Sequence, residues 1–159
     1  MNLDGKFIAY SANYKMKVLD FIEDDVDDNT YVKQVLQENG LSTSSQFSSI
    51  YKVSLDYDSD NQDEDFYIIS NAFPIDFEPD VTFSIAFMVD NNTVYTLYSN
   101  IGDNMGFNGC KPFYHSFIDT NDDNVYEIIL SCGQYSVEEQ IDMLYQFING
   151  EFKLLISNQ

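Results

Sequence analysis

The residues best suited to chemistry in this chain are carboxylates, and many of them are crowded into one short stretch. Six of the ten residues from Asp56 to Asp65 are acidic, and no lysine lies between Lys52 and Lys111. Carboxylates packed this closely repel one another, so the stretch carries an electrostatic cost. Three explanations suit such a stretch: a calcium ion, a basic protein partner, or solubility alone.

The calcium explanation is tested by comparing the spacing with an EF-hand loop. Such a loop takes oxygen ligands at positions 1, 3 and 5, glycine at 6 and a bidentate glutamate at 12. Counted from Asp56, aspartates fill the first three positions, but Asn61 stands at position 6 and Tyr67 at position 12. The second acidic stretch, 119–130, places Leu130 at position 12. The spacing does not predict an EF-hand, and we assign no metal ligand and no cofactor.

The stretch from Asp56 to Asp60 fits two conformations. If it continues a strand, Asp56, Asp58 and Asp60 line one face at about 6.7 Å intervals, and Tyr57 points to the opposite face. Such a ladder would be a good surface for rows of lysine or arginine. If it is instead the tip of a hairpin, Asp and Asn bond their own backbone in a solvated loop. The sequence leaves both open.

The sequence offers only weak support for a catalytic site. His115 is the single histidine and follows Cys110 by five residues, but a thiol–imidazole pair depends on the fold. One histidine and the two cysteines, Cys110 and Cys132, make no zinc spacing. The glycines of "IGDNMGFNG" match no phosphate-binding loop. We predict no catalytic residues and no enzyme.

Composition and charge narrow the class of partner. The 159 residues carry a net charge of −20, with 13 Phe, 12 Tyr and only seven basic residues, all of them lysine. The aromatic content favours a folded core, and the length favours a single domain, 1–159. A chain this negative should repel nucleic acid and anionic membranes and attract basic proteins. No secretory signal and no run of 18 apolar residues appears, so we expect a cytoplasmic protein. Whether Cys110 and Cys132 form a disulfide is left undecided by the sequence.

The periodicity of the chain predicts an α+β fold. "DDNTYVKQVLQENG" reads as a helix capped by Asp28 or Asn29, with Val32, Val35 and Leu36 on one face and Gly40 at its end. Phe7–Tyr10, "IYKVSLDYD", "DFYIISNAF" and "FKLLIS" read as strands, and hairpins are expected around Asn91-Asn92 and around Asp119–Asn124. The expected sheet is antiparallel, with about five to seven strands.

A second, C-terminal helix is also expected. Ser136 and Glu139 stand in capping-box register. An apolar stripe of helical spacing follows and Gly150 ends it; the stripe consists of Val137, Ile141, Leu144, Tyr145 and Ile148. With an N-terminal helical region and this amphipathic helix packed on the sheet, the predicted class is α+β.

Two stretches, "FSIAFMVDNNTVYTLYSN" and "SVEEQIDMLYQFI", carry a family resemblance. Residues 81–150 resemble immunity proteins of bacterial contact-dependent growth inhibition, which pair an aromatic-rich hairpin with a closing amphipathic helix in an acidic chain. The resemblance implies a cytoplasmic inhibitor that neutralises one cognate toxin domain, often a basic nuclease. It rests on pattern and composition and transfers no functional residue.

The acidic clusters give the same expectation from the residues themselves. We expect an acidic inhibitor that binds a basic toxin domain, with no direct nucleic-acid or membrane contact and an undetermined oligomeric state. Exposed aromatics beside the acids, Tyr57, Phe66 or Tyr67, would add anchoring energy. The predicted partner-binding residues are Asp56, Tyr57, Asp58, Asp60, Asp63, Glu64 and Asp65, with Asp24, Asp25, Asp27, Asp119, Asp122 and Asp123. The alternatives are a nucleic-acid mimic that inhibits a DNA- or RNA-binding enzyme, as in phage anti-defence, and a domain whose acidity is incidental.

Overall fold

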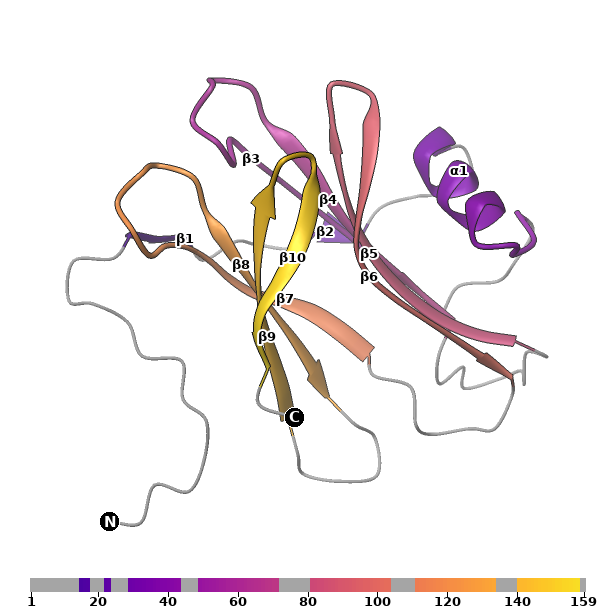
Figure 1. Ribbon diagram of the computed structural model, residues 1–159. Helices are drawn as coiled ribbons and strands as arrows, with labels where there is room; N and C mark the ends of the chain where they lie inside the picture. The colour runs from indigo at the N-terminus through magenta and orange to yellow at the C-terminus, as the bar shows by residue number, and fades with distance from the viewer. Residues whose placement is uncertain are drawn as a thin grey trace, which may run out of the picture.

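The computed structural model describes residues 15–17, 22–23, 29–43, 49–71, 81–103, 111–133 and 140–157. Within them, two antiparallel sheets pack face to face and one helix lies against the second sheet (Figure 1). The first sheet has the strand order β1 (Lys15–Lys17), β7 (Lys111–Asp119), β8 (Glu127–Gly133), β9 (Gln140–Ile148), β10 (Glu151–Ser157). The second has the order β2 (Ile22–Glu23), β3 (Ser49–Leu55), β4 (Glu64–Ser70), β5 (Val81–Asp90), β6 (Thr93–Asp103).

The main core lies between the two sheets. In β4, Phe66 and Ile68 point inward, where they meet Phe117 of β7 and Ile128 of β8. The rings of Phe66 and Phe117 lie edge to face with centroids 4.9 Å apart. In a β-sandwich, alternate residues of two facing sheets fill one layer in this way.

The single described helix, α1 (Thr30–Glu38), covers the outer face of the second sheet (Figure 1). Asn29 caps it by accepting hydrogen bonds from the backbone N–H groups of Tyr31 and Val32. Val32, Val35 and Leu36 bury their side chains against β4 and β5. Because β4 and β5 are covered on both faces, their sequences read as nearly continuous apolar runs.

The predicted α+β class is wrong, because the described part of the chain is a mostly β sandwich with one short helix. The expected C-terminal helix is strand β9 for the residues described, while Ser136, Val137 and Glu139 lie outside them. In β9 the residues Ile141, Met143, Tyr145 and Phe147 alternate toward the main core, a period of two that the helical reading overlooked. Of the two elements on which the resemblance to immunity proteins rests, the hairpin is therefore present, whereas the described part of the closing helix is a strand.

The sequence predicted hairpin turns more reliably than it predicted the C-terminal helix. The hairpin around Asn91-Asn92 joins β5 to β6, and the one around Asp119–Asn124 joins β7 to β8, as predicted. Asn91 and Asn92 both adopt positive φ, 46° and 62°, as a type I′ turn requires. Asn149 and Gly150 do the same between β9 and β10, with φ of 54° and 84°. Gly150 thus closes a hairpin rather than a helix.

Other predictions have mixed outcomes. Strands β3, β4 and β10 and helix α1 lie where the sequence placed them, whereas the expected strand Phe7–Tyr10 lies outside the described residues. The single sheet of about five to seven strands is instead two sheets of five. No described helix is long and apolar enough to cross a membrane.

Candidate functional site

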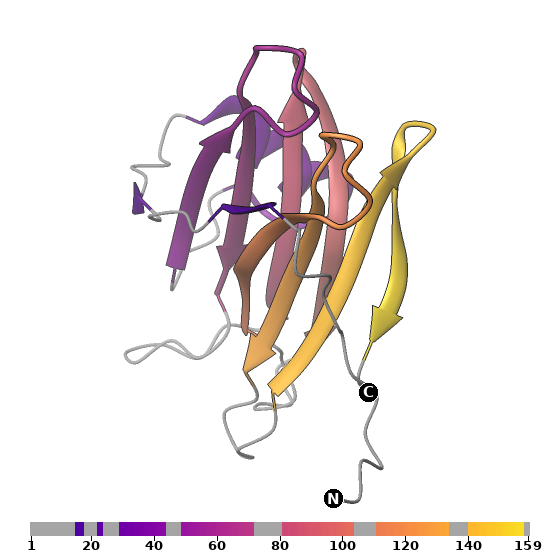
Figure 2. The same ribbon diagram turned by 90° about the vertical axis from the view of Figure 1, so that its left-hand side faces the viewer.

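Four chain reversals gather at one end of the sandwich (Figures 1 and 2). They are the β3–β4 loop (56–63), the β5–β6 turn (91–92), the β7–β8 loop (120–126) and the β9–β10 turn (149–150). We call this end of the molecule the acidic end, because both loops carry the acidic clusters noted in the sequence. Figure 2 shows the magenta β3–β4 loop and the orange β7–β8 loop at the same end of their sheets.

The two loops, one from each sheet, are joined by hydrogen bonds. The Ser59 hydroxyl donates to the carbonyl oxygen of Asn124 at 2.7 Å. The backbone N–H of Tyr126 donates to the carbonyl oxygen of Tyr57 at 3.1 Å. The structure thereby brings two clusters that are about 60 residues apart in sequence into one surface.

The β3–β4 loop is folded by its own aspartates. Oδ1 of Asp58 accepts from the backbone N–H of Asp60 at 3.2 Å, and Oδ1 of Asp60 accepts from Gln62 at 2.8 Å. Ser59 and Asn61 adopt positive φ of 65° and 69°. Strand β3 ends at Leu55, so the alternative in which Asp56, Asp58 and Asp60 form a ladder on an extended strand is not observed. The hairpin-tip alternative is the one observed.

Glu64 is the unusual residue of this loop, because its side chain is only 3% exposed. It begins β4, and its alternation with Phe66 and Ile68 turns it toward the inside of the sandwich. Oε2 accepts a hydrogen bond of 2.6 Å from the backbone N–H of Tyr57. Burial raises the pKa of Glu64 to about 7, against the lowering effect of that hydrogen bond, and the negative charges of Asp58, Asp90 and Asp60 raise it further.

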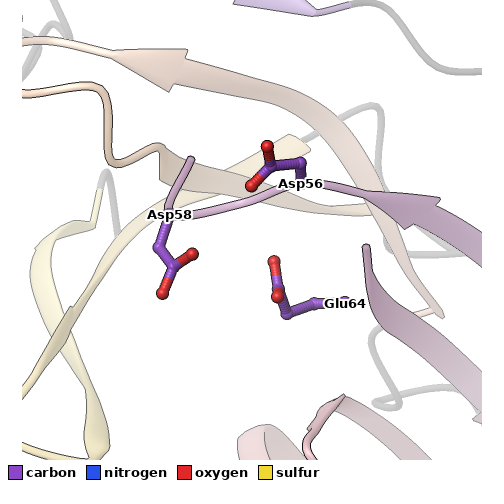
Figure 3. A group of neighbouring side chains, drawn as sticks. All are labelled: Asp56, Asp58 and Glu64. Atoms are coloured by element: carbon purple, nitrogen blue, oxygen red, sulfur yellow. The ribbon is translucent and has the colours of Figure 1, made fainter. Parts of the chain in front are cut away.

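Asp56 and Asp58 complete a group with Glu64. One carboxylate oxygen from each of the three lies within 4.8 Å of the others, and Figure 3 shows the three carboxyl groups close together. Oδ2 of Asp56 accepts from the backbone N–H of Asn61 at 3.3 Å, whereas its Oδ1 is buried and has no hydrogen-bond partner. We call these three residues the carboxylate triad. Oxygen ligands of this kind suit a hard divalent cation.

Asp90 extends the acidic end onto a third connection. It precedes the β5–β6 turn and was not among the predicted residues. Burial raises its pKa, as do the charges of Asp58 and Asp60, while a hydrogen bond from Asn91 lowers it. Its closeness to the β3–β4 loop comes from the β4–β5 pairing, in which Asp65 lies opposite Val89, and the sequence alone carried no signal for it.

The β7–β8 loop is folded around a buried aspartate. Asp119 is 2% exposed, and its carboxylate accepts from the backbone N–H groups of Asp123 at 3.2 Å and Asn124 at 3.0 Å. Asp119, a predicted contact residue, therefore shapes the loop from inside. Asp122 and Asp123 are exposed at its tip.

The expected aromatic anchors are not on the surface. Tyr57, Phe66 and Tyr67 are 1%, 0% and 2% exposed. Tyr57 packs against Phe66 and Phe152, with ring centroids 5.5 and 6.3 Å away. Since these rings fill cores on either side of the second sheet, the prediction that they are exposed beside the acids is wrong.

The remaining predicted contacts differ in availability. Asp65 lies on β4 and forms a 2.8 Å ion pair with Lys52, and it also accepts from the Ser54 hydroxyl. Asp58, Asp60 and Asp63 are exposed. Asp24, Asp25 and Asp27 lie outside the described residues. The structure thus unites the 56–64 and 119–123 clusters and gives no position for the third.

Comparison with known proteins assigns no family to this chain. No protein-family model matches it, and no curated protein or solved structure is significantly similar to it. The resemblance of residues 81–150 to immunity proteins therefore stays a hypothesis.

Proposed function

We propose that this protein is an acidic inhibitor that binds a basic protein through its acidic end. The observation that supports the proposal is the union of two acidic loops by hydrogen bonds between them. Asp58, Asp60, Asp63 and Asp123 are exposed there, and none of the four forms an ion pair within the described part of the chain. Their charge is available to a cationic partner.

The loops are held in shape before any partner arrives. Aspartate oxygens of both loops accept backbone N–H groups, as Asp60 does from Gln62 and Asp123 does from Val125. A preformed surface loses less conformational entropy on binding than a disordered acidic tail would. Its clustered charge would also accelerate encounter with a basic protein at low ionic strength.

A basic toxin domain, such as a nuclease, is the partner class we propose, and the protein would then serve as its immunity protein. The net charge of −20 and the aromatic hairpin of β5 and β6 support this reading. Because the aromatics of the two loops, Tyr57 and Tyr126, are buried, charge rather than aromatic insertion should dominate the contact. Binding should therefore weaken steeply with added salt.

The experiment is capture of partners by the tagged full-length chain from its native host at low salt, in the presence of EDTA. We expect a stoichiometric basic protein, whose affinity is then measured for the wild type and for D60N/D63N. Asparagine keeps the Oδ1 acceptor of the Gln62 backbone N–H that folds the loop, while it removes the charge and, at Asp60, the acceptor of the Gln62 side-chain amide. The variant should bind at least about tenfold more weakly.

The matched control is E38Q/D142N, which removes one charge from the last residue of α1 and one from the start of β9, where Asp142 lies opposite Ser131 and away from the two loops. It should bind within about twofold of the wild type. Equal weakening by both double variants would show a diffuse charge effect and contradict the assignment of the acidic end. Displacement of the captured enzyme's DNA or RNA by this protein would favour the nucleic-acid mimic instead.

Action in the cytoplasm is part of the proposal and has its own test. Cys132, buried in β8, is disulfide-bonded, and disulfides persist mainly in oxidising compartments. The bond at Cys132 is thus the observation that stands against the cytoplasm. Thiols are alkylated during lysis of the host cells, and the modified cysteines are counted by mass spectrometry. If the protein acts in the cytoplasm, the bond is reduced and two modified cysteines are expected, whereas a chain with no free thiol contradicts cytoplasmic action.

A further inference from the structure

The carboxylate triad has the dimensions of a cation site. The oxygens of Asp56, Asp58 and Glu64 lie within 4.8 Å of one another. Three oxygens spread evenly around one ion lie about 4.2 Å apart on Ca²⁺ and about 3.6 Å apart on Mg²⁺, which is the metal–oxygen distance times the square root of three. A spacing of up to 4.8 Å is therefore nearer to that of the larger ion, and a small movement of the exposed Asp58 side chain would close the remaining gap (Figure 3).

One buried oxygen without a hydrogen-bond donor, together with the burial of Glu64, sets this triad apart from an ordinary acidic surface. Oδ1 of Asp56 has no hydrogen-bond partner although it is buried. Glu64 is almost fully buried, with 3% of its surface exposed. The one hydrogen bond described to its carboxylate comes from the Tyr57 N–H. A buried carboxylate oxygen without a donor costs free energy that a bound cation would remove.

Protein cations do not supply that compensation in the described part of the chain. The ion pairs there join Lys52 to Asp65 and Lys153 to Glu151, not to the triad. The charges that act on Glu64 are those of Asp58, Asp90 and Asp60, all of the same sign as its own. Three converging carboxylates without a cationic side chain favour a cation from solution over a proton on Glu64 once the pH exceeds the pKa of that residue, about 7.

We propose that Asp56, Asp58 and Glu64 bind one divalent cation of calcium size, with water completing its coordination. The site differs from an EF-hand, because Glu64 comes from the first position of a strand rather than from a following helix. The site shares Asp58 with the proposed partner surface, but its existence does not depend on the inhibitor function. A bound ion would tie the tip of the β3–β4 loop to β4 and, through Ser59 and Asn124, steady the contact with the β7–β8 loop.

The test is titration of the full-length protein, cleared of metal with EDTA and dialysed, with CaCl₂ in a calorimeter. Tb³⁺ provides a second probe, because tyrosine sensitises its luminescence and the chain has 12 Tyr and no Trp. We expect one saturable site, Ca²⁺ displacement of the Tb³⁺ signal, and weaker competition by Mg²⁺. D58N and E64Q should each weaken binding at least about tenfold, since affinity follows the number of charged ligands.

D63N is the matched control, because Asp63 is exposed in the same loop but lies outside the triad. It should leave the calcium affinity within about twofold of the wild type. Absence of saturable binding, equal loss in D63N, or preference for Mg²⁺ would overturn the proposal. D58N changes an exposed side chain, so the test stands even if E64Q fails to fold. No partner protein takes part in this titration, so its failure leaves the inhibitor proposal untouched.

Discussion

The two acidic loops are built alike but treat their buried carboxylates differently. Each loop is followed by a strand whose first residue is a buried glutamate, Glu64 in β4 and Glu127 in β8. Glu127 accepts hydrogen bonds from the N–H and hydroxyl of Thr120, at 2.9 and 2.7 Å, and from the Gln146 amide at 3.1 Å. Glu64 accepts one, from Tyr57.

This difference separates a structural carboxylate from a candidate ligand. A buried carboxylate with several donors stabilises the fold as it stands, whereas one with a single donor and acidic neighbours is held at a cost. The β7–β8 loop is therefore complete by itself, and the β3–β4 loop retains unmet acceptors. Substitutions that act on one loop and spare the other test the distinction.

The largest expected effect is the loss of stability when Tyr57 is replaced, a residue whose carbonyl oxygen accepts the Tyr126 N–H that joins the two loops. Tyr57 of the β3–β4 loop is buried in the main core. Tyr57→Ala should lower the free energy of unfolding by about 3–5 kcal/mol, because it leaves a large cavity. Urea denaturation measures the loss, with Tyr57→Phe as a control that keeps the ring. A stable Tyr57→Ala protein that has lost partner affinity would mean that Tyr57 is a contact residue after all.

A smaller loss is expected at Glu127. Glu127→Ala removes the acceptor of three hydrogen bonds and should cost about 1–3 kcal/mol of unfolding free energy. The same denaturation measurement applies, and partner binding of the folded fraction should be retained because Glu127 is buried. A loss below about 0.5 kcal/mol would show that the donors find water, and the contrast between the loops would fail.

The smallest effect, opposite in sign, is expected for Glu64→Gln in EDTA. The pKa of Glu64 is about 7 in the folded protein and near 4.5 in an unfolded chain. Between these values the folded state binds more protons than the unfolded state, so the contribution of Glu64 to stability falls as the pH rises. The variant lacks this decline and should match or exceed the wild type by up to about 1 kcal/mol at pH 8.

Denaturation at pH 5 and pH 8 checks the sign of this effect. The difference between E64Q and wild type should be near zero at pH 5 and favour the variant at pH 8. D63N should show no comparable change between the two values. A variant less stable than the wild type at pH 8 would mean that the charge of Glu64 is already compensated within the fold.

Sequence patterns predicted local structure better than its assembly. Asn29 with Val32, Val35 and Leu36 predicted α1 because cap and apolar face lie within one helix. In β9 the residues Ile141, Leu144, Tyr145 and Ile148 fit a helix, while Ile141, Met143, Tyr145 and Phe147 fit a strand. Pairing with β8 and β10 decides between them, although Asn149-Gly150 was a usable hairpin signal.

The candidate site shows the same limit. Residue types located both acidic clusters, but their union depends on the Ser59–Asn124 and Tyr57–Tyr126 hydrogen bonds between different sheets. The alternation of Glu64 with Phe66 and Ile68 predicts that its side chain is buried. The high charge of the surrounding stretch led to the opposite expectation, that Glu64 is exposed. The EF-hand template also missed the triad, because it looked for the closing glutamate at position 12.

The most direct test of the account is the partner affinity of D60N/D123N, which removes one charge from each loop, compared with E38Q/D142N, which removes two charges away from them. If the loops form one binding surface, the first variant should bind at least about tenfold more weakly and the second within about twofold of wild type. The salt dependence should also flatten in D60N/D123N alone. Equal affinities for the two variants would contradict the claim that the acidic end is the binding surface.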